Sequence, residues 1–300
     1  MMISSKPSER MREMNDYIIM TDSAADISPE ILAQWGVPFV SLTYKFDDET
    51  QSWGNYEKPF SAFYQKMRSG GVARTAAVNM ETFKQSFAPI LQQGKDLLYI
   101  CFSSGLSTTF QSSAMAVEEL HEQFPDRKLI TVDSLSASSG QGLLVKLTVD
   151  RKNAGATIEE AAQFVRDTRL HLDHWFTVDD LVYLKRGGRV SAAKAFVGGL
   201  LNIKPVLHVD DEGHLINMFK VRGRKASLKA LAEKYGELIQ DRNEQIFISH
   251  GDCLGDAQEL ERMLREAYGV QVTLINEIGP VIGAHSGPGT LALFFVGKER

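Results

Sequence analysis

The chain has 300 residues, of which 43% are hydrophobic, and carries a formal net charge of −5 with a pI near 5.9. This composition predicts a globular protein of one large or two modest domains and excludes a chain that is disordered throughout. The acidic balance gives no general attraction to nucleic acid or to an anionic membrane surface.

The N-terminal segment and the cysteines indicate where the protein works. Residues 1–15 are polar and lack the apolar core of a secretory signal, so we expect a disordered N-terminal extension there. No apolar run is long enough to span a bilayer. Cys101 and Cys253 lie in or beside apolar runs, and no C-x-x-C metal motif occurs. The sequence therefore predicts a cytoplasmic protein with no integral membrane segment and no metal site.

Apolar runs rich in β-branched residues alternate with helical periodicity in the first half of the chain. The runs at 17–23, 97–103 and 128–134 are each followed by a helical pattern. This alternation predicts βαβ units and a mostly parallel α/β/α sheet in an N-terminal domain over residues 16–175. All three runs end in serine, so the helices after them should begin at the carboxyl edge of the sheet, where open α/β folds bind ligands.

The pattern changes after Thr157. The stretch "TIEEAAQFVRDTRLHLDHWF" (157–176) predicts an amphipathic helix, and shorter runs with turn signals follow it. One pair of these runs predicts a hairpin around Asp211–Gly213. We therefore expect a second α/β domain over residues 176–300.

A hydroxyl-rich turn, "SSGLSTT" (103–109), joins one of the predicted strands to its helix. Ser107 directly precedes the first helical turn, where free N–H groups and the helix dipole form an anion site, and Gly105 permits close backbone approach. The alternative is that Ser107 only caps the helix. Asp22 and Asp133, at the other two strand ends, could bind a metal, but capping and turn roles suit them better because a hard-metal site needs more oxygen ligands.

Two later stretches contain further candidates. In "LVYLKRGGRVSAAKAFVGGLLNIKPVL" (181–207), basic residues flank a Gly-Gly turn and an apolar helix is predicted to begin at Ser191. Basic residues outnumber acidic ones throughout 185–225, which favours a docking face or a phosphate-bearing partner, with an ordinary solvated face as the alternative. In "GAHSGPG" (283–289), His285 precedes Ser286 in a glycine-rich turn.

Several function classes can be weighed on these residues. A serine hydrolase has candidates in Ser104 or Ser107, His285 and Asp22, but the turn lacks the G-x-S-x-G nucleophile elbow. No phosphate-binding or dinucleotide-binding glycine motif occurs. Binding of a small anion by hydroxyl and backbone donors between the two domains fits best, and a serine hydrolase or esterase acting on a small acyl substrate remains the alternative.

Several motifs in order resemble one family over residues 17–297. The chain resembles the DegV family of bacterial proteins, including its FakB-like fatty-acid-binding branch, in the following stretches: "TDSAADIS", "SSGLSTTFQSS", "VDSLSASSGQGLLV", "LKRGGRVSAAKAFVGGLLNIKPVL", "VRGRKASLKAL" and "IGPVIGAHSGPGTLALFFVG". The resemblance implies a two-domain DegV-like fold whose C-terminal domain has a mixed or antiparallel sheet. It also implies a long-chain fatty acid, such as palmitate or oleate, bound between the domains without another cofactor.

The resemblance further implies a non-catalytic carrier. FakB-like members present their fatty acid to a separate Dak-type fatty acid kinase subunit, which makes acyl phosphate for phospholipid synthesis. The family's carboxylate-binding threonine falls on Thr75, although the usual "TSQP" context reads "TAAV" here, and its serine falls on Ser107, with Ser104 as second choice. The family's histidine falls on His285, near the head group. The basic surface that would face the kinase or the nascent acyl phosphate comprises Arg186, Arg189 and Arg222.

Overall fold

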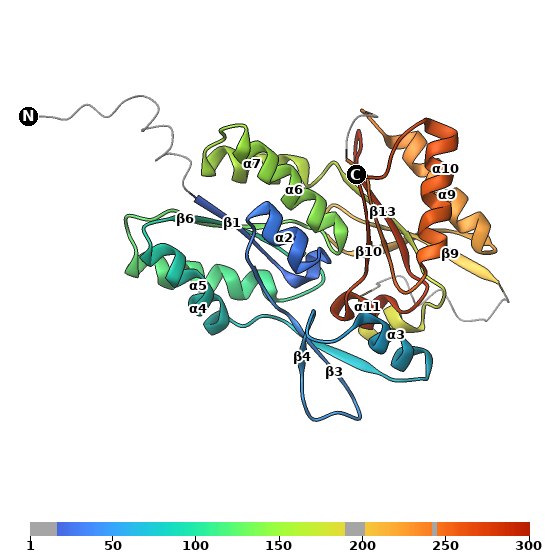
Figure 1. Cartoon of the computed structure of the whole chain (residues 1–300), viewed down its shortest axis with the longest axis horizontal. Helices are drawn as coiled ribbons and strands as arrows, with labels where there is room; N and C mark the ends of the chain where they lie inside the picture. The colour runs from blue at the N-terminus through green and yellow to red at the C-terminus, as the bar shows by residue number, and fades with distance from the viewer. Residues whose placement is uncertain (1–16, 190–201, 242–244) are drawn as a thin grey trace, which may run out of the picture.

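The computed structural model describes residues 17–189, 202–241 and 245–300, and its strands form three sheets (Figure 1). The predicted extension over 1–15 and the helix predicted to begin at Ser191 lie outside the described residues. None of the helices described is long and apolar enough to cross a membrane.

The first sheet has four parallel strands in the order β2-β1-β6-β7. Its strands are β1 (Tyr17–Asp22), β2 (Phe39–Val40), β6 (Asp96–Cys101) and β7 (Leu129–Asp133). Helices α4 (Met80–Gln92) and α5 (Thr109–Gln123) cover one face, and α6 (Ser139–Asn153) and α7 (Ile158–Thr168) cover the other (Figure 1). The short helices η1 (Ser23–Ala25) and α2 (Pro29–Trp35) follow β1. The predicted parallel sheet is confirmed, and its three hydroxyl-rich strand ends lie at one edge.

The second sheet has six strands in the order β10-β9-β8-β13-β11-β12, all antiparallel except the pair β11 and β12. Its strands are β8 (Leu172–Thr177), β9 (Ile203–Val209), β10 (Leu215–Arg222), β11 (Phe247–His250), β12 (Leu274–Glu277) and β13 (Leu291–Val296). Helices α9 (Arg224–Leu238) and α10 (Leu254–Tyr268) pack on its outer face. The mixed sheet and the hairpin between β9 and β10 agree with the expectations from the sequence.

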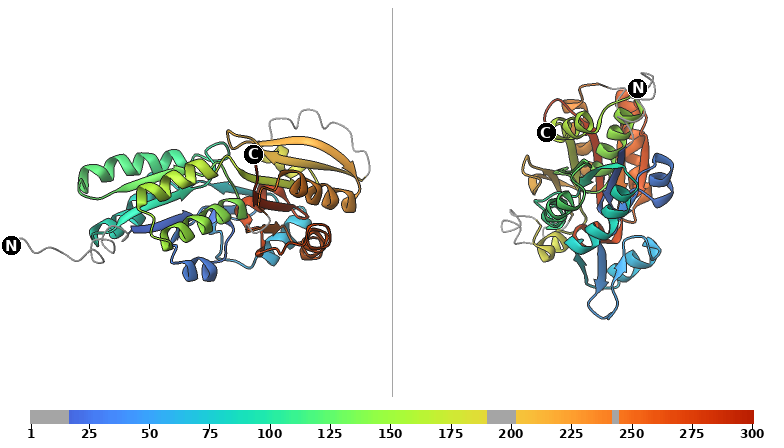
Figure 2. Two further views of the ribbon diagram at one scale, coloured as in Figure 1. Left: turned by 90° about the horizontal axis from the view of Figure 1, so that it is seen from above. Right: turned by 90° about the vertical axis from the view of Figure 1, so that its left-hand side faces the viewer.

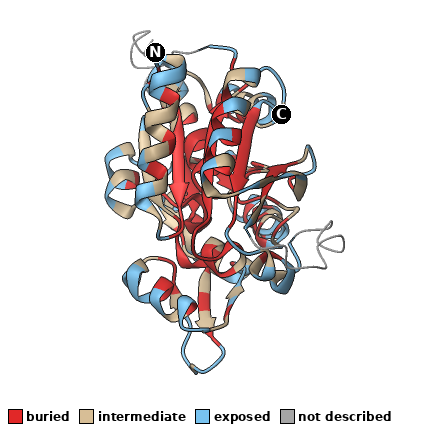
Figure 3. Cartoon of the chain, turned by 90° about the vertical axis from the view of Figure 1, so that its right-hand side faces the viewer, coloured by how far each residue is buried: buried red, intermediate tan, exposed pale blue. Residues whose placement is uncertain are grey.

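Helix α6 lies between the two large sheets. Every residue from Ser139 to Val145 is buried, because α6 packs against β1 and β6 of the parallel sheet and against β8, β11 and β13 of the mixed sheet. The hydrophobic core is therefore continuous from Ile100 of β6 to Phe294 of β13. Figure 2 shows the two units from two further directions, and Figure 3 shows that buried residues concentrate along the strands and the elements between the sheets.

A small antiparallel sheet, in the order β4-β3-β5, completes the fold. Its strands are β3 (Thr43–Phe46), β4 (Trp53–Gly54) and β5 (Ala73–Ala76), and α3 (Phe60–Arg68) follows β4 in the chain. Helix α11 (Pro280–Ser286) leaves the six-stranded sheet to pack against α3, β3 and β5. The Tyr64 hydroxyl donates to the Ile278 carbonyl at 2.7 Å, which holds the start of α11 against α3.

One expected element is wrong. The helix predicted over 157–176 ends at Thr168, and Leu172–Thr177 forms β8, the third strand of the six-stranded sheet. All six residues of β8 are buried, because the strand has α9 on one face and α6 on the other. A strand buried on both faces shows no alternation of polar and apolar residues. The domain boundary predicted at 176 falls inside this strand.

Asp26 ties the two large units together at the N-terminal end of α6. Its carboxylate accepts a hydrogen bond from the Ser138 hydroxyl at 2.6 Å and another from the Gly279 N–H at 3.0 Å. The Asn276 amide also donates to the Asp26 carbonyl at 2.9 Å. Burial raises the pKa of Asp26 to about 8, because the charged form loses its hydration and these hydrogen bonds only partly replace it.

This raised pKa makes stability depend on pH. The folded state holds the Asp26 proton up to about pH 8, whereas the unfolded chain releases it near pH 4. The stabilisation is complete at low pH and is lost as pH rises toward the folded pKa, by up to about 1.4 kcal/mol per pH unit for this one proton. We expect the free energy of unfolding of Asp26→Asn, measured by urea denaturation, to rise relative to that of the wild type between pH 5 and pH 8. Asp126→Asn, at an exposed site, is the control, and parallel pH profiles for wild type and Asp26→Asn would contradict this account.

Candidate ligand-binding cavity

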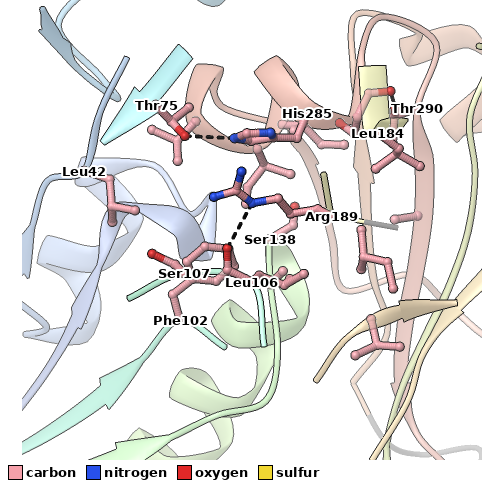
Figure 4. A pocket seen from close by; sticks show the side chains of 18 of the residues that line it. Leu42, Thr75, Phe102, Leu106, Ser107, Ser138, Leu184, Arg189, His285 and Thr290 are labelled. Carbon is pink, nitrogen blue, oxygen red and sulfur yellow. Dashed lines mark hydrogen bonds between the residues drawn. The ribbon is translucent and has the colours of Figure 1, made fainter. Parts of the chain in front are cut away.

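A cavity of about 300 Å³ lies between the carboxyl edge of the parallel sheet and the inner face of the six-stranded sheet. We call it the inner cavity (Figure 4). Its lining is mainly apolar: Leu42, Phe102, Leu106, Phe176, Leu184, Val209, Leu215, Ile278, Val281, Ile282, Ala292 and Phe294. Because both large sheets contribute, the cavity exists only when the two units are packed together.

Thr75 and His285 meet at one end of the inner cavity. The Thr75 hydroxyl, at the end of β5, lies 2.8 Å from His285 Nε2 in the last turn of α11 (Figure 4). The sequence predicted both residues, and the structure brings them together across 210 positions of the chain. We call this end of the inner cavity the head end.

The His285 ring is neutral and fixed in place. Burial, reinforced by the nearby positive charge of Arg189, lowers the pKa of His285 to about 4. Its Nδ1 is buried and finds no hydrogen-bond partner among the described residues. An orphaned acceptor is tolerated more readily than an orphaned N–H, so we assign the proton to Nε2. Thr75 then accepts from His285, and its own hydroxyl proton is free to donate to a ligand.

Gly187 makes room for this ring. A Cβ added to Gly187 would lie 2.2 Å from His285 Nδ1, although the backbone at Gly187 is not in the left-handed region. The neighbouring Gly188 differs, because its φ of +67° favours glycine and no described residue lies within 4 Å of an added Cβ. Gly187, the last residue of α8 (Val182–Gly187), and Gly188, its C-cap, therefore serve different purposes.

Ser107 lines the inner cavity beside the start of α5. The N-cap of α5 is Thr108, one residue later than expected, and its side chain makes no capping hydrogen bond. The Ser107 hydroxyl accepts from the Thr109 N–H at 3.2 Å and lies 2.8 Å from the Thr109 hydroxyl. When Thr109 donates both of these bonds, the Ser107 proton is free for a ligand in the cavity.

Ser104 and Gly105 face a different neighbour. Ser104 is not among the residues that line the inner cavity, and its N–H donates to Asp133 at 3.2 Å. A Cβ on Gly105 would lie 2.8 Å from the carbonyl oxygens of Glu212 and Gly213. Gly105 therefore admits the turn between β9 and β10 rather than a ligand, an arrangement that the sequence pattern did not reveal.

Arg189 reaches into the head end. Its Nε donates to the Leu106 carbonyl at 3.2 Å, and its side chain extends between the Thr75–His285 pair and the Leu106–Ser107 segment (Figure 4). The sequence assigned Arg189 to a basic surface, and the structure also places it on the inner cavity.

A second cavity, of about 230 Å³, adjoins the head end, and we call it the outer cavity. Thr75, Arg189 and His285 line both cavities. Arg74 and Arg186 line only the outer cavity, and Arg74 also pairs with Asp47 at 2.6 Å. Arg222 lines neither cavity and is exposed at the end of β10. An apolar space thus adjoins a cationic one, with three shared residues between them.

The two candidate metal-binding aspartates accept local hydrogen bonds. Asp22 is the N-cap of η1 and accepts from the N–H groups of Ala24 and Phe102 and from the Tyr99 hydroxyl, and Asp133 accepts from the N–H groups of Ser104 and Leu135. Capping and turn roles are therefore confirmed for both. Within the described part of the chain, no group of three or more His, Cys, Asp or Glu residues could hold a metal ion.

The head end presents two hydroxyls, and among the described residues no serine is hydrogen-bonded to His285. Within the described ranges, His285 pairs with Thr75, Ser107 pairs with Thr109, and the Ser286 hydroxyl has no hydrogen-bond partner. A serine hydrolase needs a serine within hydrogen-bond reach of its base. Two neutral hydroxyls beside one guanidinium instead suit an anion at the end of an apolar body.

Comparisons with known proteins agree over nearly the whole chain. The sequence model of the family described as "Uncharacterised protein, DegV family" matches residues 17–298. A DegV domain-containing protein of Clostridium perfringens is 44% identical over 290 residues, which cover 96% of this chain and 99% of the relative. The solved structure of a DegV lipid-binding protein from Thermotoga maritima has 30% identity and a TM-score of 0.81, covering 95% of this chain and 99% of that one. A DegV family protein from Thermus thermophilus, described for its fatty acid binding, has 27% identity and a TM-score of 0.83, covering 94% and 99%.

The buried, neutral state of His285 can be measured. We expect His285 to titrate near pH 4 in an NMR titration of the histidine ring signals. In Gly187→Ala the new methyl group displaces the ring from Thr75 and from its buried position, so its pKa should rise toward the usual 6.5 or so. Gly188→Ala is the matched control, since it strains the turn by about 1 kcal/mol without touching the ring. If His285 titrates identically in all three proteins, Gly187 does not position the ring.

Proposed function

Because the chain belongs to the DegV family, we propose that it binds one long-chain fatty acid, with the tail in the inner cavity and the carboxylate at the head end. The observation that carries this proposal is an apolar cavity that ends in two hydroxyl donors and one guanidinium. Palmitate and oleate are representative ligands. Related proteins described as lipid-binding or fatty-acid-binding have the same fold.

The tail supplies most of the binding free energy. Burial of each methylene contributes about 0.8 kcal/mol, so on the order of twelve methylenes contribute roughly 10 kcal/mol before the costs of association. A hydrogen bond to the charged head contributes about 1.5–3 kcal/mol. The head contacts therefore mainly orient the ligand and fix where its carboxylate lies.

Three groups are available for the carboxylate. The hydroxyls of Thr75 and Ser107 donate, and His285 holds Thr75 so that its proton points away from the ring. Arg189 adds a positive charge that the sequence interpretation, built on neutral donors alone, did not include. A charged donor forms a stronger hydrogen bond with a carboxylate than a neutral one does.

The outer cavity gives the bound acid a second role. Arg74 and Arg186, which line only this cavity, lie beyond Thr75 and His285 from the tail, where a phosphoryl group could meet the carboxylate. We propose that a separate Dak-type fatty acid kinase uses this side: a carboxylate oxygen attacks the γ-phosphorus of ATP, the bond to ADP breaks, and acyl phosphate forms. The present chain acts as a carrier that presents the acid and contributes no catalytic group of its own. Arg186, Arg189 and Arg222 form the proposed partner-facing set.

The carboxylate contacts can be tested by substitution. Ser107→Ala and Thr75→Val each remove a donor to a charged group, so we expect the Kd for oleate to rise about ten- to hundredfold. The Kd for oleyl alcohol should change less, because its head carries no charge. Ser104→Ala is the matched control and should leave both values unchanged. Isothermal titration after removal of co-purified lipid gives the Kd of each variant for each ligand.

The same variants distinguish the alternative. Equal weakening for the acid and the alcohol would mean that the substitutions disturb the cavity rather than the carboxylate contacts. Steady turnover of an activated acyl ester by the wild type, abolished in Ser107→Ala, would favour the serine hydrolase.

Docking to the kinase can be separated from lipid binding. Arg186 is exposed and lines only the outer cavity, so we expect Arg186→Glu to keep the wild-type Kd for oleate and to slow kinase-dependent acyl phosphate formation at least tenfold, a loss of about 1.4 kcal/mol. Lys229→Glu, an equal charge reversal at an exposed position of α9, is the control. If the kinase forms acyl phosphate at the wild-type rate with Arg186→Glu, Arg186 is not part of the docking surface.

A further inference from the structure

The inner cavity has a defined far end. Phe176 of β8 pairs with Ala292 of β13, and His174 pairs with Phe294 two residues further along; all four line the cavity. The next pair on the same face, Leu172 and Val296, does not line it. His285 and Thr290 precede β13 in the chain and mark the opposite end. The lining therefore stops at His174 and Phe294.

Hydrogen bonding and packing fix the His174 ring at this end. Its Nδ1 donates to the Leu172 carbonyl at 2.9 Å, and the ring packs edge-on to Phe294 with centroids 5.5 Å apart. Only 2% of the residue is exposed. Burial, reinforced by the positive charge of Arg300, lowers the pKa of His174 well below its usual range. The ring is therefore neutral and cannot rotate without losing its hydrogen bond.

Gly140, near the start of α6, packs against the His174 ring. A Cβ on Gly140 would lie 2.4 Å from His174 Nε2 and 2.8 Å from a ring carbon of Phe294. Nε2 is buried in this contact and has no hydrogen-bond partner among the described residues. Since Nδ1 is hydrogen-bonded to Leu172 and Nε2 is buried against Gly140, neither nitrogen is available to a ligand in the cavity. The cavity thus ends at a fixed, uncharged histidine ring that offers no hydrogen bond.

We propose that His174, seated against Gly140, sets the maximum length of the acyl chain, an inference that rests on the fatty-acid binding proposed above. A chain that just reaches the ring buries all of its methylenes. A longer chain must bend or displace the ring, since a close-packed interior has no space to receive it. The position is a determinant of ligand specificity and has no role at the head end.

Two substitutions should shift the length preference in opposite directions. His174→Ala removes the ring, so longer acids should bind better, with affinity rising about fourfold for each additional methylene that is buried. Gly140→Ala pushes the ring and Phe294 into the cavity, so the preference should move to shorter acids. In the double variant the methyl group introduced by Gly140→Ala no longer meets an imidazole and displaces only Phe294, so the shortening should be smaller than in the single variant.

The experiment uses the full chain, stripped of lipid and incubated with an equimolar series of straight-chain acids from laurate to arachidate. The retained acids are quantified by mass spectrometry after removal of unbound lipid. His250→Ala is the matched control, because His250 is also buried and accepts from the Cys253 N–H but does not line the cavity. It should lower thermal stability and leave the length distribution unchanged.

Each result has a separate meaning. Retention of no acid by the wild type would overturn the proposed function itself. If the wild type retains acids, an unchanged distribution in His174→Ala would overturn the length inference, as would an equal shift in His250→Ala. If Gly140→Ala fails to fold, the comparison of His174→Ala with His250→Ala still decides.

Discussion

The hydrogen bond between Thr75 and His285 depends on the position of α11, which reaches from the six-stranded sheet to the small sheet. This helix lies in the chain between two strands of the six-stranded sheet, yet it packs against α3 and the small sheet. Tyr64 holds the residue before Gly279, and Asp26 holds the Gly279 N–H. Because both contacts are buried hydrogen bonds between units, a change that separates the units also moves His285. The geometry of the head end therefore follows from interdomain packing rather than from any single loop.

Burial determines the electrostatics of this head end. A protonated His285 would place a buried cation beside the positive charge of Arg189, and desolvation with like-charge repulsion disfavours that state by lowering the pKa of His285. The histidine then acts as an uncharged support for Thr75, while Arg189 contributes the charge. An arginine anchored on a carbonyl oxygen and open to the outer cavity can hold a carboxylate without the full cost of a buried ion pair. Binding by a partly exposed arginine suits a ligand that is later released.

Some features could be predicted from the sequence because local chemistry determines them. The parallel sheet, the β9–β10 hairpin and the roles of Asp22 and Asp133 follow from periodicity, turn residues and side chains that accept backbone N–H groups. β8 could not be predicted, because tertiary burial on both faces overrides the helical pattern that precedes it. The role of Gly105 could not be predicted either, because the turn that it contacts lies far away in the chain, at Glu212 and Gly213. Thr75 and His285 could be named from the family resemblance, but their contact is a product of the fold.

The far end of the cavity could not be predicted from the sequence, for the same reason as β8. His174 lies in the segment expected to be helical, where a histidine carries no signal of a binding role. In the structure His174 lies in β8, and its position is fixed because hydrogen bonds to both neighbouring strands hold β8 in place. The stretch of chain from Thr290 to Phe294, most of it in β13, covers about 13 Å at the usual rise of a strand. An apolar cavity alone would admit any chain that fits its volume. When the carboxylate is bound at the head end and the His174 ring closes the far end, the distance between them along β13 limits the length of the acyl chain. Selectivity for the tail is then independent of the chemistry at the carboxylate.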